Sequence, residues 1–189
     1  MRRYHPDMAT VDVLHAGYTG DRVGSSVVLV RDGDALIVVD PGMVRARSLI
    51  LDPLAARGVA PAAVTHVFVS HHHLDHTMNI ALFPNAEVGD VESRYREDLW
   101  LDHAGDGYRL SARSQLWQTP GHTDQDASLI VEADDGVYAM THCWWHADRT
   151  PPLDPFCRDA ALLERSRHRL IETADVIIPG HGTPFRLRP

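Results

Sequence analysis

Cysteine is scarce in this chain, with Cys143 and Cys157 the only two among 189 residues. Two cysteines do not make the framework of bridges that holds small secreted domains together, so we expect both thiols to be reduced. Long apolar runs are also lacking, since no stretch approaches the roughly 20 residues that a membrane-spanning helix needs. The N-terminal residues have no apolar core of signal-peptide length. These absences predict a cytoplasmic protein without a membrane segment.

Positive charge is in short supply as well. Lys and Arg total 18 against 26 Asp and Glu, which gives a formal net charge of -8 at pH 7. A chain of this charge is not drawn broadly to nucleic acid or to an anionic membrane. The basic stretch "ERSRHR", residues 164–169, is better explained as the solvated face of a helix than as an RNA-binding patch. We therefore expect a small-molecule substrate, with RNA as the less favoured alternative and no membrane partner.

The length and a hydrophobic content of 44% predict one domain over residues 1–189. Stretches rich in Val and Ile predict strands. Asp-Gly pairs between two such stretches predict hairpins that turn at residues 31–34 and 134–136. Strands followed by helices, once in each half of the chain, indicate sheets covered by layers of helix.

Three segments have the periodicity or composition of helices. Residues 43–58 have apolar positions at helical spacing, although Pro53 is expected to kink or divide that helix. A less distinct helix is expected around Trp100 and His103. The clearest amphipathic helix covers residues 156–174. Its predicted apolar stripe consists of Phe156, Ala160, Leu163, Leu170 and Ile171.

Histidine, by contrast, is abundant, with 13 residues. The densest cluster is "HHHLDH", which begins at His71, directly after an apolar stretch. Alternate residues of an extended segment share a face, so His71 and His73 are expected to point to one place while His72 points away. Asp75 and His76 follow where the chain begins to turn. The cluster is therefore a candidate metal site that aims side chains at one or two neighbouring ions.

Three more histidines directly follow predicted strands: His122 in "TPGHT", His142 in "AMTH" and His181 in "PGHG". Glycines beside His122 and His181 permit tight backbone turns that aim a side chain out of a strand end. Imidazole and carboxylate ligands together suit zinc, manganese or iron better than calcium or copper(I). We predict a centre for one or two divalent transition-metal ions, zinc first, with iron and manganese as alternatives.

These motifs resemble those of a known family. "HHHLDH" matches H-x-H-x-D-H, and with "TPGHT" and "PGHG" downstream in that order the chain resembles the metallo-β-lactamase-fold hydrolases. More narrowly, "LFPNA", "TPGHTDQDASLIV" and "ERSRHRLIETADVIIPGHGTPFR" resemble the family of metallo-β-lactamase domain-containing protein 1 and its compact relatives. The resemblance implies an α/β fold, namely an αββα sandwich of two mixed sheets flanked by helices. It also implies a first metal on His71, His73 and His122 and a second on Asp75, His76 and His181.

One position departs from that pattern. The family's bridging ligand is an aspartate in a Gly-Asp pair, where this chain has Thr141 and His142. A neutral imidazole normally ligates one ion, so the bridge is lost and two ions would leave the site about one charge unit more positive. We expect a weaker second site, a longer metal separation or a single occupied site. Alternatively, His142 becomes an extra ligand in a histidine-rich site that is better suited to iron.

Residues beside the ligands are candidates for supporting roles. Asp124 and Asp126 are expected to orient the ring of His122. Trp144 and Trp145 are as consistent with a wall of the substrate pocket as with packing elsewhere. Further candidates for the metal's surroundings are Cys143, His146 and Asp148.

The resemblance implies hydrolysis, in which a metal lowers the pKa of bound water so that it can attack a carbonyl or phosphorus. Asp75 would ligate a metal and orient that water, and Asp75 and His142 are the candidate catalytic residues. The expected substrate is a small ester, thioester, lactone or phosphodiester. Two alternatives stay open: an iron-dependent redox enzyme on the same fold, and a metal-binding protein whose active site has decayed with the loss of the aspartate.

Overall fold

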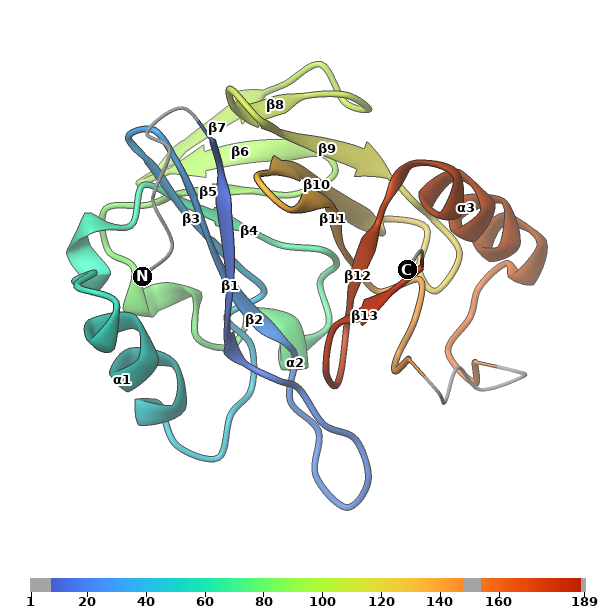
Figure 1. Cartoon of the computed structure of the whole chain (residues 1–189), viewed down its shortest axis with the longest axis horizontal. Helices are drawn as coiled ribbons and strands as arrows, with labels where there is room; N and C mark the ends of the chain where they lie inside the picture. Colours follow the sequence, from blue (N-terminus) through green and yellow to red (C-terminus); the bar gives the residue numbers. More distant parts are fainter. Residues whose placement is uncertain (1–7, 148–153, 188–189) are drawn as a thin grey trace.

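The computed structural model describes residues 8–147 and 154–187 and consists of two mixed β-sheets flanked by helices (Figure 1). In the first sheet, β3, β4 and β5 are parallel and the other neighbours antiparallel. Its seven strands lie side by side in chain order: β1 (Thr10–His15), β2 (Val27–Asp32), β3 (Ala35–Val39), β4 (His66–Phe68), β5 (Glu87–Gly89), β6 (Ser93–Arg96) and β7 (Leu99–Asp102).

The second sheet has six strands, in the order β13, β12, β11, β10, β9 and β8. Only β11 and β12 are parallel. The strands are β8 (Arg109–Ser111), β9 (Ser114–Gln118), β10 (Ala127–Ala133), β11 (Gly136–Thr141), β12 (Val176–Pro179) and β13 (Phe185–Arg186). Both predicted hairpins are present, because β2 pairs with β3 across Gly33 and β10 pairs with β11 across residues 134–136.

Three apolar clusters hold the layers together. The first joins the facing sides of the sheets, with Val30 and Phe68 on one sheet and Leu129 on the other. The outer face of the first sheet packs against α1 (Ser48–Ala56) through Ile50 and Leu54. The outer face of the second sheet packs against α3 (Ala160–Thr173) through Leu163 and Leu170. Side chains alternate between the two faces of a strand, so each sheet contributes to two clusters, which confirms the predicted fold class.

The predicted helices differ from the observed ones at their ends. α1 begins at Ser48, and Pro53 lies within it instead of dividing it. α3 begins at Ala160, where the carboxylate of Asp159 accepts a hydrogen bond from the Leu162 amide at 2.8 Å. The predicted stripe of α3 is correct at Leu163 and Leu170. It is wrong at Phe156, which precedes the helix, and at Ala160 and Ile171, which are exposed. The buried Ser166 lies with Leu163 and Leu170 on the inner face of the helix.

The helix predicted around Trp100 is wrong, because that segment is the β6–β7 hairpin. Glu97 turns it with a φ of 55°, and the Trp100 Nε1 donates to Ser93 Oγ at 2.6 Å. His103 follows β7 in a loop. Cross-strand pairing overrides the local sequence pattern here. Among the described residues, no helix combines the length and the apolar character that crossing a membrane requires.

Candidate metal centre

The histidines predicted as ligands lie at one end of the sandwich, where several strands finish. His71 follows β4, His122 follows β9, His142 follows β11 and His181 follows β12. Each of these four imidazoles is buried. The short helix α2 (Leu74–Thr77) contains Asp75 and His76, and His73 directly precedes it. The structure therefore brings together all seven residues predicted from the sequence.

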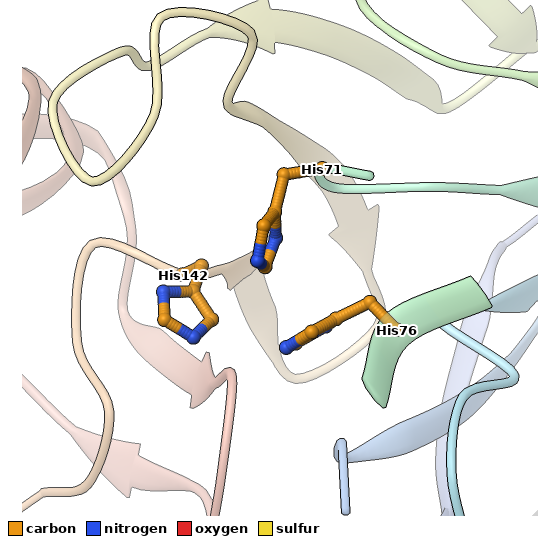
Figure 2. A group of neighbouring side chains, drawn as sticks. All are labelled: His71, His76 and His142. Carbon is orange, nitrogen blue, oxygen red and sulfur yellow. The ribbon is translucent and has the colours of Figure 1, made fainter. Parts of the chain in front are cut away.

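Among the described residues, three groups of side chains have ligand atoms within 4.8 Å of one another. We call them the first group (His71, His73 and His122), the second group (Asp75, His76 and His181) and the central group (His71, His76 and His142). The first and second groups are the two metal sites implied by the family resemblance. The central group, drawn in Figure 2, contains the histidine that replaces the family's bridging aspartate.

Several imidazoles are oriented by an acceptor on the side away from the centre. The Nδ1 of His76 lies 2.8 Å from Asp40 Oδ2, and the Nδ1 of His122 lies 2.6 Å from Asp154 Oδ2. The Nδ1 of His181 donates to the carbonyl oxygen of Gly24 at 2.9 Å. A carboxylate or carbonyl accepts only, so these contacts place the proton on Nδ1 and leave the lone pair of Nε2 directed at the centre. This is the arrangement that metal-binding histidines commonly have.

Burial favours the neutral, metal-binding form of His71, His142 and His181. The pKa values of His71 and His142 are well below the ordinary value because of burial first and neighbouring imidazoles second. The same causes lower the pKa of His181 to about 4. For His76, burial acts in the same direction, but the charge of Asp40 and its hydrogen bond outweigh burial and raise the pKa.

The donor atoms fit a bound cation. The Nε2 of His71 lies 3.0 Å from the Nδ1 of His73, and the Nε2 atoms of His142 and His181 lie 3.3 Å apart. The buried Nε2 of His76 and Nδ1 of His142 have no hydrogen-bond partner among the described residues. Buried nitrogens that face one another or lack a partner cost free energy unless something satisfies them, and a divalent ion shared between them does so.

Two carboxylates that support the centre were not predicted. Asp40, at the end of β3, accepts hydrogen bonds from the backbone amide and the hydroxyl of Ser70, both at 2.7 Å, besides contacting His76. Its position after "LIVV" at a strand end is a signal that sequence reasoning could have used. Asp154 lies 32 positions from the ring that it orients, and no local pattern marks it.

Asp154, rather than Asp124 or Asp126, orients His122, which corrects the prediction. The carboxylate of Asp126 accepts hydrogen bonds from the amide and hydroxyl of Thr123, each at 2.7 Å, and so supports the loop instead of the ring. Asp124 is exposed.

The other candidates near the ligands have separate roles. Burial raises the pKa of the Cys143 thiol to about 12, which disfavours the thiolate that a metal would bind. Trp144 packs toward α3, whereas Trp145 lines the pocket beside the metal ligands. His146 is outside the three groups and its Nε2 lies 2.8 Å from Thr19 Oγ1. Asp148 lies outside the described residues.

The centre opens into a pocket of about 540 Å³. Its walls include Val23, Leu74, Trp145 and Phe156. The rings of Trp145 and Phe156 stack at an interplanar angle of 10°. The ligand candidates that line the pocket are His73, Asp75, His122, His142 and His181. A small molecule in this pocket would therefore contact both the metal centre and an apolar wall.

Asp40→Asn is expected to weaken metal binding by about 10- to 100-fold, because an amide is a weaker acceptor for the His76 proton than a carboxylate. Competition with a coloured chelator measures that affinity. The matched control is Asp124→Asn, the same substitution at an exposed carboxylate, which should leave the affinity within about twofold. Equal loss of affinity in both variants would refute the positioning role of Asp40.

Comparisons with known proteins agree with this geometry. A model of the metallo-beta-lactamase superfamily matches residues 20–150. The chain is 35% identical over 191 residues to metallo-beta-lactamase domain-containing protein 1 of Xenopus laevis, covering 94% of this chain and 82% of that protein. It spans 64% of the length of the human protein of the same name.

Solved structures show the same fold. A crystal structure from Thermotoga maritima has a TM-score of 0.77 at 19% identity, covering 95% of this chain and 99% of the other. An N-acyl homoserine lactone hydrolase has a TM-score of 0.67 at 18% identity, covering 93% of each chain.

Proposed function

This chain belongs to the metallo-β-lactamase superfamily, and on that premise we propose that it is a metal-dependent hydrolase of small esters, thioesters or lactones. The observation that carries the proposal is the position of the ligand candidates: five of them line a pocket that is also lined by the apolar side chains of Val23, Leu74, Trp145 and Phe156. Metal and substrate would thus share one enclosed space. A structural neighbour that hydrolyses a lactone supports an acyl substrate.

When bound, a divalent metal supplies a water of lowered pKa and polarises the carbonyl oxygen of the substrate. The protein's own contribution at this point comes from Asp75. Its Oδ2 lies 3.5 Å from the Nε2 of His76 and 3.7 Å from that of His181, and the residue lines the pocket. A carboxylate there accepts a hydrogen bond from the attacking water and orients it.

The pocket walls favour an uncharged acyl group. Trp145 and Phe156 stack with ring centroids 6.2 Å apart, and the Nε1 of Trp145 donates to Asp154 at 3.0 Å, which holds the indole in place. No Lys or Arg is among the described residues that line the pocket. A phosphodiester would bring a negative charge without a cationic side chain to meet it, so we favour esters, thioesters and lactones over phosphodiesters.

The test is hydrolysis before and after metal removal. Protein dialysed against a chelator should lose about 100-fold or more of its activity on p-nitrophenyl acetate, p-nitrophenyl hexanoate or hexanoyl homoserine lactone, and added zinc, manganese or iron should restore it. Trp145→Ala should raise KM for the hexanoyl ester more than for the acetyl ester, because the longer chain contacts the indole. Turnover of bis(p-nitrophenyl) phosphate alone would contradict the proposed substrate class, and metal-independent turnover would contradict the mechanism.

An iron-dependent redox enzyme is the second candidate, and the central group is the observation that favours it. Imidazole ligands suit both iron(II) and zinc. Oxygen consumption by iron-loaded protein, without hydrolysis of any acyl substrate, would establish this candidate in place of the first.

A further inference from the structure

We infer that this chain holds a single metal ion at a site absent from its family's pattern, the central group of His71, His76 and His142. The inference deepens the proposed function and rests on it only in taking the centre to bind metal. In the family's pattern, the first and second groups each hold an ion and an aspartate joins the two. Here one ion would lie between those positions.

The central group is formed by three different elements and is the most buried of the three groups. His71 follows β4, His76 belongs to α2 and His142 follows β11. Their side chains are 1%, 0% and 3% exposed. The ring centroid of His71 lies 4.2 Å from that of His76 and 4.6 Å from that of His142. Figure 2 shows the three imidazoles around a common space.

Unsatisfied nitrogens point to a ligand at this place. The Nε2 of His76 and the Nδ1 of His142 are the only histidine nitrogens of the three groups that are buried without a hydrogen-bond partner in the described part of the chain. Both belong to the central group. Within residues 8–147 and 154–187, no carboxylate orients the ring of His142, in contrast to those of His76 and His122, and the Nε2 of His142 lies 3.3 Å from the Nε2 of His181. A metal bound by His76 and His142 would relieve this loss of hydrogen bonding.

Occupancy of the central group by one ion excludes ions in both outer groups. Asp40 takes the Nδ1 proton of His76, and Ser70 Oγ lies 3.1 Å from the Nδ1 of His71, so each ring has one lone pair for metal. An ion in the central group uses both lone pairs. The first group then keeps His73 and His122, and the second keeps Asp75 and His181. Two ligands are too few for tight binding of zinc, which normally takes three or four from the protein.

The charge of the ligand set also favours one bound ion over two. Asp75 is the only carboxylate in the three groups, so two divalent ions would leave a formal charge of about +3 on the ligand set and one ion about +1. Repulsion between two ions a few ångströms apart is large in a buried site. Without the bridging carboxylate of the family, Asp75 is the only negative charge in the ligand set that offsets that repulsion.

Glycine at position 180 makes room for the histidine. A Cβ there would lie 2.2 Å from the Cδ2 of His142, so the imidazole packs directly on the backbone of Gly180. The ring is thus accommodated beside the centre rather than directed to solvent. Three imidazole ligands in this setting are suited to zinc or iron(II).

The test counts metal ions in the full chain and in variants that separate the three groups. Cobalt(II) serves as a visible probe and zinc(II) as the metal for elemental analysis after desalting. We expect one equivalent in the native protein. His73→Ala and His181→Ala, each of which removes one outer ligand, should still hold one equivalent. His142→Gln, which keeps most of the side-chain volume, should weaken binding by about 100-fold, and His142→Asp should raise the content from one equivalent to two.

Circular dichroism and thermal melting of each metal-free variant check that it folds. Two equivalents in the native protein would overturn the inference, and so would loss of the metal from His73→Ala with retention in His142→Gln. These outcomes are separate from catalysis. Hydrolysis of acyl substrates by a protein that holds two metal ions would support the proposed function and refute the central site. One equivalent of metal at the central group without hydrolysis would support the central site and contradict the proposed function.

Discussion

His71→Ala is expected to abolish tight metal binding and to lower metal-dependent hydrolysis by about 1,000-fold, equivalent to about 4 kcal/mol of transition-state stabilisation. The effect should be large because His71 belongs to both the first and the central group. Its loss therefore removes a ligand whether the ion lies in the first group or in the central group. The imidazole is only 1% exposed, and solvent does not replace it readily. Elemental analysis and initial rates on an acyl ester measure the two effects.

The matched control is His72→Ala, one position along the chain. The His72 side chain is 42% exposed and its Nε2 lies 2.9 Å from Asp90 Oδ2, away from the ligands. A half-exposed contact of this kind contributes little, so metal content should stay at the native value and activity within about twofold. Equal losses in the two variants would show that the alternation of side chains along residues 71–73 does not define the site.

Gly42→Ala is expected to lower the free energy of unfolding by about 3 kcal/mol or more and to weaken metal binding with it. A Cβ at Gly42 would lie 1.7 Å from the backbone oxygen of Asp75 and 2.6 Å from the Cα of His76. Both atoms belong to backbone, so no side-chain rotation relieves the overlap. The same oxygen of Asp75 accepts a hydrogen bond from the Met43 amide at 3.0 Å, and this contact holds α2 against the segment that contains Gly42 and Met43.

Urea denaturation of the metal-free protein measures the change in unfolding free energy, and chelator competition measures the metal affinity. Gly89→Ala is the control, because a Cβ at Gly89 would meet no atom within 4 Å. Its unfolding free energy should change by about 0.5 kcal/mol or less. A Gly42→Ala protein as stable as the Gly89→Ala protein would contradict the close approach of the two segments.

Much of the centre could be predicted from local pattern. The alternation in "HHHLDH" separates His72 from His71 and His73, and the structure has His72 exposed and the other two in the first group. Histidines directly after apolar strands were expected to converge on the "HHHLDH" cluster, since strand ends gather at the edges of sheets. His122 joins His71 and His73, and His181 joins Asp75 and His76. The hairpin turns at Gly33 and Gly136 follow from Asp-Gly pairs between apolar stretches.

Other features depended on contacts between distant segments. The β6–β7 hairpin forms where a helix was expected, because pairing with β5 and the contact of Trp100 with Ser93 decide the conformation. The supporting carboxylates were missed or misassigned for the same reason. Asp154 reaches His122 across 32 positions, and Asp40 reaches His76 across 36. Proximity in sequence pointed to Asp124 and Asp126 instead.

The sequence alone predicted sheets covered by helices and the set of ligand candidates, because strand periodicity, turn residues and histidine spacing are local properties of the chain. The αββα sandwich was implied by the resemblance of its motifs to a known family. Only the tertiary structure decided which acceptor orients each imidazole, which tryptophan faces the pocket, and that His142 lies within reach of both His71 and His76. Those relations depend on how β4, α2 and β11 pack against one another. The packing depends on the interlocking of many apolar side chains across two sheets, and no short stretch of sequence contains that information.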